Sequence, residues 1–155
     1  MLALGLLCTT AVAASAQSHV SHAKLGKAST ETPVFTLERT QCRGVCAEYK
    51  LSFFSDGRVI YDGKANVSKF GIWRATISRN DITEIVTYFQ RLNFFSLENS
   101  YAGGLSQNPV AITSWRQSDR VKTITHDEGS PFSPEALTTL EDRIDAAVQS
   151  ADWVR

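Results

Sequence analysis

The chain of 155 residues lacks most of the sequence features that indicate a function, and each missing feature argues against one class of protein. Basic and acidic residues number 16 each, so no excess charge gathers phosphates, and nucleic acid is not expected as a partner. Neither a G-x-G-x-x-G pattern nor a Walker loop is present, which leaves nucleotide binding without support. No G-x-S-x-G motif places a serine on a nucleophile elbow.

Long apolar runs are also missing, apart from one near the start. Leu2 to Ala14 is apolar and small, but too short to cross a bilayer as a mature helix. Ala14-Ser15-Ala16 fits an A-x-A cleavage site, so residues 1–16 are predicted to be a signal peptide of a periplasmic or secreted protein. No Lys or Arg precedes the apolar run, so either the true start lies upstream or the leader is atypical.

Cysteine is scarce, and the leader would remove one of the three residues. Cys8, a weak lipoprotein candidate behind Leu7, is lost on cleavage, which leaves Cys42 and Cys46. An even count in an oxidising compartment favours a disulfide, and Gly44 at the midpoint permits the tight turn. The small loop would contribute about 2 kcal/mol, with a local effect on the following strand. The Cys42–Cys46 pair is therefore predicted to be structural.

Two other roles for these cysteines remain open. A redox-active pair is the first, although C-x3-C is not the C-x-x-C at a helix start that lowers a thiol pKa. A metal site is the second, but only His126 is available within the domain as a third soft ligand. We therefore expect no metal and no cofactor.

The remaining sequence predicts a flexible linker over residues 17–33 and a single domain over residues 34–155. Apolar alternation predicts strands at 34–40, 49–54, 59–62, 72–77, 110–116 and 121–126. Apolar residues at helical spacing follow Ser78, which has Asp81 three residues on, and Ser133, which we expect to cap a second helix. The expected fold is α+β in the order β-β-β-β-α-β-β-α, with about six mainly antiparallel strands and two helices on one face.

The motif Cys42-x-Gly44-x-Cys46-x-x-Tyr49, followed by Asp56-Gly57, Val59, Tyr61 and Gly63, is similar to a family signature. It resembles a family of small exported bacterial domains of unknown function with the pattern C-x-G-x-C-P-x-Y…DG-x-V-x-Y-x-G. The resemblance extends from about Val34 to Trp153, with Ala47 in place of the expected proline. It implies export and a shared fold, and it transfers no catalytic residue.

The favoured function is a non-enzymatic binding module of the cell envelope, with an envelope protein as the expected class of partner. Arg43, Val45 and Glu48, displayed around the two cysteines, are the expected partner surface. One alternative is a thiol–disulfide protein that uses Cys42 and Cys46. A second, weaker alternative is a hydrolase built on His126 and Asp127, with Ser130 or Ser133 cast as the nucleophile. Aromatic residues left on an open sheet face would suggest a partner site.

Overall fold

Seven strands and two α-helices make up the part of the chain that the structure describes. The computed structural model describes residues 31–40, 42–103, 108–149 and 151–155. The strands are β1 (Phe35–Arg39), β2 (Glu48–Phe53), β3 (Arg58–Ala65), β4 (Gly71–Thr76), β5 (Ser100–Tyr101), β6 (Val110–Gln117) and β7 (Arg120–Asp127). The helices are α1 (Arg79–Arg91), α2 (Glu135–Ala146) and the 3-10 turn η1 (Phe94–Ser96). The predicted signal peptide, and the predicted linker up to residue 30, lie outside the described residues.

The strands form one mixed sheet in the order β4-β3-β2-β1-β6-β7-β5. Every neighbouring pair is antiparallel except β5 and β7, which are parallel. The α+β class is therefore as predicted, but the expected number of about six strands misses β5. Two residues are too few to show an alternating pattern, so the sequence does not reveal this edge strand.

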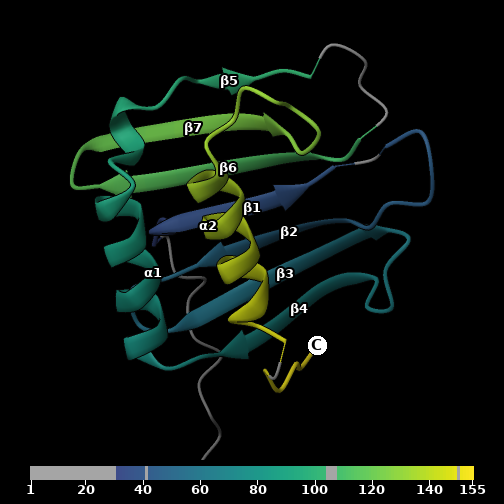
Figure 1. Cartoon of the computed structure of the whole chain (residues 1–155). Helices are drawn as coiled ribbons and strands as arrows, with labels where there is room; N and C mark the ends of the chain where they lie inside the picture. Colours follow the sequence, from purple (N-terminus) through teal and green to yellow (C-terminus); the bar gives the residue numbers. More distant parts are fainter. Residues whose placement is uncertain (1–30, 41, 104–107, 150) are drawn as a thin grey trace, which may run out of the picture. The chain divides into compact units, whose positions relative to one another are not determined.

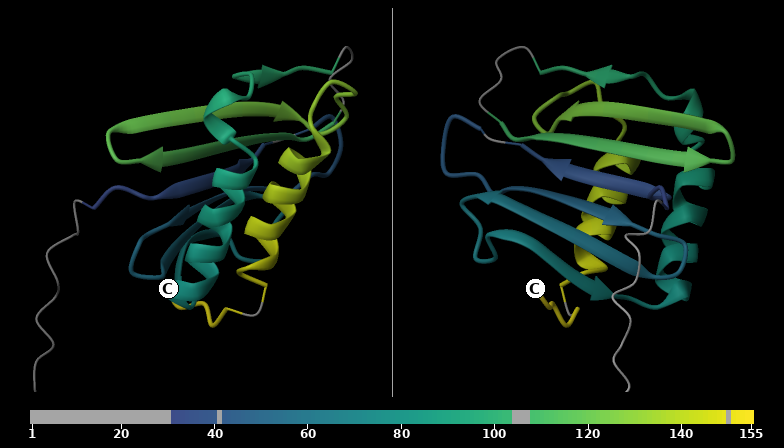
Figure 2. Two further views of the ribbon diagram at one scale, coloured as in Figure 1. Left: turned by 60° about the vertical axis from the view of Figure 1, so that its left-hand side comes forward. Right: turned by 180° about the vertical axis from the view of Figure 1, so that it is seen from behind.

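Both helices lie on one face of the sheet, and the opposite face has no helix over it in the described residues (Figures 1 and 2). Helix α1 begins with the predicted Ser78–Asp81 capping box, in which each side chain accepts a hydrogen bond from the other residue's backbone N–H. Its buried residues are Ile82, Ile85 and Phe89, which recur at helical spacing. Within the described residues, neither helix is long and apolar enough to cross a membrane.

The predicted cap of α2 is wrong. Pro134 occupies the cap position, and no side chain satisfies the first backbone N–H groups. The Ser133 hydroxyl instead donates to the backbone oxygen of Ser130, 3.1 Å away, within the preceding loop. A local turn competes successfully for this serine, because short hydroxyl side chains bond as readily to nearby loop carbonyls as to helix N–H groups.

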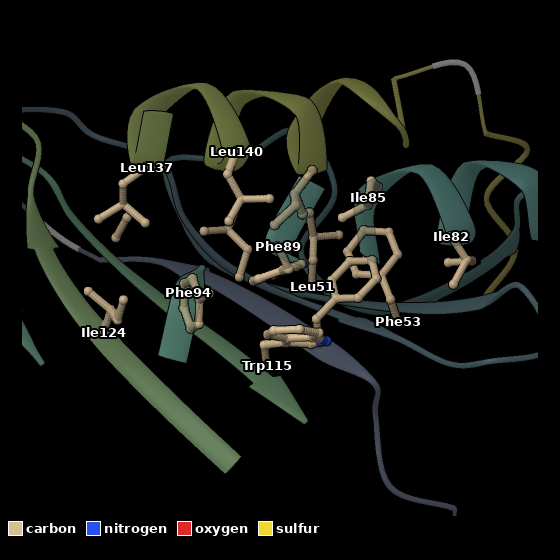
Figure 3. Packing of buried hydrophobic residues seen from close by; sticks show 14 of the residues in the cluster. Leu51, Phe53, Ile82, Ile85, Phe89, Phe94, Trp115, Ile124, Leu137 and Leu140 are labelled. Carbon is tan, nitrogen blue, oxygen red and sulfur yellow. The ribbon is translucent and has the colours of Figure 1, made fainter. Parts of the chain in front are cut away.

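The core lies between the sheet and the two helices and is rich in aromatic rings (Figure 3). Phe35 on β1 stacks on Phe53 of β2, with ring centroids 4.5 Å apart. Phe89 of α1 stacks on Trp115 of β6 at 5.1 Å and meets Phe94 edge-on at 4.9 Å. Each such side chain, when fully buried, contributes roughly 1.5–3 kcal/mol to folding. One cluster therefore joins the strands on both sides of β1 to α1.

The sequence alone does not decide to which face of the sheet Tyr49, Tyr61 and Trp73 project. The structure places them on the face that the helices cover. Tyr49 and Tyr61 pack against the core, and Trp73 is paired directly with Tyr61, so it shares that face. Glu38, on the opposite face of the sheet, forms ion pairs with Lys50 at 3.4 Å and Lys64 at 2.7 Å. The three aromatic rings are consequently directed toward the helices and not toward an open-face partner.

Candidate functional site

One row of directly paired residues crosses the sheet where β1 ends. Arg39 is paired with Tyr49 of β2 on one side and with Ala111 of β6 on the other, and Ala111 is paired with His126 of β7. Directly paired residues project to the same face, and Tyr49 packs against the core. The side chains of Arg39 and His126 therefore face the helix layer, where α2 covers them.

Helix α2 brings Glu141 over this row. The Glu141 carboxylate is fully buried and accepts a hydrogen bond from the Thr113 hydroxyl at 3.0 Å. Its other oxygen, Oε2, lies 2.8 Å from Nδ1 of His126, whose side chain is also fully buried. The Nε2 atom of His126 has no hydrogen-bond partner in the described chain. The contacts of Glu141 with Thr113 and His126 therefore tie α2 to β6 and β7.

Asp145, one helical turn beyond Glu141, binds the other end of the row. Arg39 donates to Asp145 Oδ2 from Nε at 3.1 Å and from Nη2 at 2.8 Å. The Tyr49 hydroxyl donates to Asp145 Oδ1 at 2.7 Å. Both carboxylate oxygens of Asp145 are thus engaged by neighbouring residues of β1 and β2.

These contacts change the proton affinities of both donors. Burial lowers the pKa of Arg39, but the charges of Asp145, Glu128 and Glu141 outweigh that effect, so the net direction is upward. Burial also raises the pKa of Tyr49, and the nearby Asp145 carboxylate raises it further. Both groups therefore remain protonated hydrogen-bond donors at neutral pH.

Arg39 is surrounded by carboxylates. Besides Asp145, its guanidinium forms an ion pair with Glu128, which follows β7. Glu141 and Asp142 lie 3.8 Å away. One cation thus compensates four carboxylates, and removing it would leave the buried Glu141 without a positive neighbour among these pairs.

A hollow of about 300 Å³ opens beside Asp145, between α2, the strands β2 and β3, and the segment after α2. Tyr61 is the middle of three aromatic rings in its wall: its centroid lies 5.5 Å from that of Tyr49 and 5.6 Å from that of Trp153. The complete lining consists of Tyr49, Leu51, Tyr61, Ser68, Lys69, Asp145, Val148, Gln149 and Trp153. Three separate segments of the chain therefore supply its aromatic wall.

The polar groups that line the hollow are of two kinds: those of the floor are hydrogen-bonded within the part of the chain that the structure describes, and those of the rim are not. Tyr49 and Asp145 are bonded to each other. In contrast, the side chains of Ser68, Lys69 and Gln149 and the Tyr61 hydroxyl have no hydrogen-bond or ion-pair partner within the described residues. The hollow consequently combines ring faces with polar groups that remain available to a ligand.

Gly63 allows the rim to approach the sheet closely. A Cβ atom at this position would collide with the backbone oxygen of Lys69, and it would lie 2.8 Å from the Tyr61 ring. The connection between β3 and β4 therefore passes directly over Gly63, which carries Ser68 and Lys69 to the hollow. The signature glycine of the sequence thus has a steric role in this site.

The two cysteines lie in the loop that joins Arg39 to Tyr49. Their sulfur atoms are at disulfide distance, with Cα atoms 5.7 Å apart, which is ordinary for a disulfide. The loop connects β1 to β2, and its described residues, 40 and 42–47, contain no helix whose N-terminus could lower a thiol pKa. The Asn66 side chain, from the β3–β4 connection, donates to the Cys46 oxygen at 3.0 Å. The cysteine loop therefore contacts the connection that carries Ser68 and Lys69 to the hollow.

The three residues of the predicted partner surface are displayed unequally. Arg43 is exposed, and Val45 is 88% exposed. Glu48 is half-buried in β2, at a point where the pairing with β3 shifts register between Glu48 and Tyr49. Arg43 and Val45 thus stand exposed on the loop, while Glu48 lies in the sheet and does not line the hollow.

The residues of the hydrolase hypothesis do not form a catalytic arrangement. His126 is sealed beneath α2, while Asp127 accepts backbone hydrogen bonds from Gly103 at 3.1 Å and Gly129 at 3.0 Å. The Ser130 hydroxyl donates to the backbone oxygen of Ala102 at 3.2 Å. Within the described residues, no group of three or more His, Cys, Asp or Glu side chains is placed to hold a metal ion. Asp127 and Ser130 serve the turn after β7.

Of the polar residues beneath α2, only His126 stands out in the sequence analysis, although the sequence also carries signals for Glu141 and Arg39. Glu141 falls within the apolar stripe of α2, four residues after Leu137 and three before Ile144. Arg39 continues the buried alternation of Phe35 and Leu37 in β1. A charged residue in each buried pattern indicates an internal ion pair, because such residues are rarely buried without a partner.

Comparison with known proteins identifies a family but no activity. Residues 33–148 match the family described as Domain of unknown function (DUF6438), so the chain belongs to this family. A search of curated proteins found no match.

Proposed function

We propose that this member of the DUF6438 family is a non-enzymatic binding module of the cell envelope, with its ligand held in the aromatic hollow. The observation that carries the proposal is the combination of three partly buried aromatic rings with uncommitted polar groups around one hollow. Ligand sites commonly pair apolar and aromatic walls with a few polar groups that fix orientation. The aromatic wall would supply contact area to the ligand, and the polar groups of the rim would fix its orientation.

The arrangement favours binding over catalysis because the carboxylate that lines the hollow is already engaged. Asp145 accepts from Arg39 and Tyr49, and the pKa of Tyr49 is raised. His126 is fully buried and does not line the hollow. A general acid or base must reach a proton on its substrate, so Asp145 and Tyr49 would first have to give up these hydrogen bonds.

The cysteine loop extends the proposed contact surface. Arg43 and Val45 stand exposed on it, and the Asn66 contact joins the loop to the connection that carries Lys69. We assign Arg43, Val45 and Glu48 to contact with an envelope partner, with Arg43 and Val45 on the loop and Glu48 at the start of β2. A closed loop suits this role because it loses little conformational freedom on binding.

The binding proposal can be tested with the purified full-length exported protein and cell-envelope extract. We expect the wild type to retain an envelope component, and Tyr61→Ala to retain at least about tenfold less, which corresponds to about 1.4 kcal/mol. Phe132→Ala is the matched control, because Phe132 is 78% exposed and does not line the hollow. Equal retention by all three proteins, or none by any, would rule out the proposed site.

Export itself is a proposal that rests on the leader and on the cysteine pair. A thiol count on the protein recovered from the exporting cell, with and without reductant, provides the test. Export into an oxidising compartment predicts no reactive thiol before reduction and two afterwards. Two free thiols in the non-reduced sample would contradict both the disulfide and this compartment.

A further inference from the structure

We infer that the hollow binds a neutral saccharide, with a sugar ring against the Tyr61 and Trp153 faces and its hydroxyls on the polar rim. This inference rests on the proposed binding function and specifies the class of its ligand. Three properties of the lining support it: the shape of the aromatic wall, the chemistry of the free polar groups, and the balance of charge.

The aromatic wall is suited to a flat and partly apolar surface. The Tyr61 and Trp153 rings meet at 57° and therefore form an angled wall, whereas Tyr49 and Tyr61 are nearly parallel at 25°. Tyr and Trp present an apolar ring together with a polar group, which suits ligands that are apolar on one side and wet on the other. A sugar ring has this character, since its C–H groups form a face while its hydroxyls project from the edge.

The free groups on the rim include both donors and acceptors. Lys69 supplies donors, Ser68 and the Tyr61 hydroxyl supply both functions, and the Gln149 amide supplies an oxygen and an NH₂ group. A hydroxyl donates one hydrogen bond and accepts two, so a polyhydroxylated ligand can satisfy this mixture. A purely anionic or purely cationic group would leave one half of it unused.

The charges of the lining favour a neutral ligand. Lys69 and Asp145 are its charged residues, and they sum to zero. Arg39, whose Nη2 lies 2.8 Å from Asp145, does not line the hollow and is itself also paired with Glu128. Glu128 and Asp142, the other carboxylates around Arg39 at the surface, do not line the hollow. The lining therefore has no net charge that would select an ion over a neutral sugar.

The test is calorimetric titration of the full-length protein with cellotriose, maltotriose and tri-N-acetylchitotriose. We expect at least one to bind with a Kd in the range of about 10 μM to 1 mM, which is −7 to −4 kcal/mol. Tyr61→Ala should weaken this binding by at least about tenfold, and Lys69→Gln by about threefold or more. Phe132→Ala should leave it unchanged, because Phe132 lies outside the lining.

Fluorescence provides a second measurement that a merely structural role would not affect. Of the three tryptophans, Trp115 is buried in the core and Trp153 lines the hollow. Sugar binding should change the wild-type emission, and Trp153→Phe should remove this change while calorimetry still detects binding.

The possible outcomes separate the ligand class from the function. Absence of saccharide binding, with an envelope component still retained by the wild type and lost from Tyr61→Ala, overturns the saccharide inference and leaves the binding proposal standing. Failure of both measurements overturns both. Saccharide binding that is unaffected by Tyr61→Ala overturns the assignment to this hollow.

Discussion

Arg39 illustrates how one side chain can organise a site without touching its ligand. It lies at the end of β1, is almost fully buried, and joins Asp145 of α2 with Glu128 beyond β7. A buried ion pair adds little net stability relative to an apolar pair, but removing one partner strands the other charge. Arg39 thus compensates the negative charge of the α2 face that packs on the sheet. It also holds Asp145 at the floor of the hollow.

Replacing Arg39 should therefore be severe. We expect Arg39→Met to lower the free energy of unfolding by about 3–5 kcal/mol, because the buried Glu141 and the partly buried Asp145 and Glu128 lose their cation. Urea denaturation monitored by circular dichroism measures this change. Arg58→Met is the matched control, since Arg58 pairs with Asp56 at the surface, where water screens the charges. Its effect should be much smaller, and equal losses in the two variants would contradict the buried-pair account.

The Tyr49 hydroxyl makes stability depend on pH in the alkaline range. Its folded-state pKa is raised above the ordinary value of 10.0, first by burial and then by Asp145. The stabilisation is therefore fully present below the unfolded pKa and decreases as pH rises through and beyond it. We expect urea midpoints to fall between about pH 9 and pH 11. Tyr49→Phe should show a shallower fall, and identical pH profiles for the two proteins would contradict this role.

At the scale of single elements, the two helices begin by different means. Helix α1 has a complete capping box, whereas α2 starts at Pro134 without a side-chain cap. The starting position of α2 is instead held by tertiary contacts, in which Glu141 and Asp145 bind four strands of the sheet. Most of the stability of a short helix comes from such packing, so a missing cap is tolerated.

The difference in capping predicts unequal effects of serine removal. Ser78→Ala should destabilise the protein by about 1 kcal/mol, because it leaves the Asp81 backbone N–H without its partner. Ser133→Ala should change stability by less than about 0.5 kcal/mol, since Ser133 bonds within a loop. Both values follow from urea denaturation at neutral pH. A loss of about 1 kcal/mol in Ser133→Ala would show that this serine caps α2 after all.

At the scale of the whole domain, a single core connects the elements on which the site depends. Residues 31–155 form one compact unit, and Phe89 of α1 contacts Phe35, Phe94 and Trp115 within it. The hollow lies at the edge of the layer in which both helices pack on the sheet. Its geometry therefore persists only while the core is intact, and we expect the domain to unfold in one cooperative step.

Truncation of the core should affect the entire unit. Phe89→Ala should lower the free energy of unfolding by about 3–5 kcal/mol, with coincident transitions in near- and far-ultraviolet circular dichroism. Phe70→Ala is the control, because Phe70 is 68% exposed, and its effect should be much smaller. Separate transitions for secondary and tertiary structure in Phe89→Ala would contradict a single cooperative unit.

The sequence by itself determined the kinds of element, because strand alternation and helical spacing are local patterns. The sequence indicated the capping box of Ser78 and the pairing of Cys42 with Cys46. It also contains the family signature, which ends at Gly63. The predicted cap of α2 was wrong, because the Ser133 hydroxyl bonds to a loop carbonyl instead. No strand was predicted at β5, because two residues are too few to show a pattern. Charged residues within buried patterns, above all Glu141, indicate an internal ion pair that was not predicted.

Tertiary structure alone decided which distant residues meet. Arg39 and Asp145 are 106 positions apart, and their contact depends on β1 lying in the middle of the sheet beneath α2. The face to which Tyr49 and Tyr61 project, and the approach of Trp153 that completes the hollow, likewise depend on which side the helices cover. Local periodicity specifies that a face is buried, but the choice of covering element is made by packing of the whole chain.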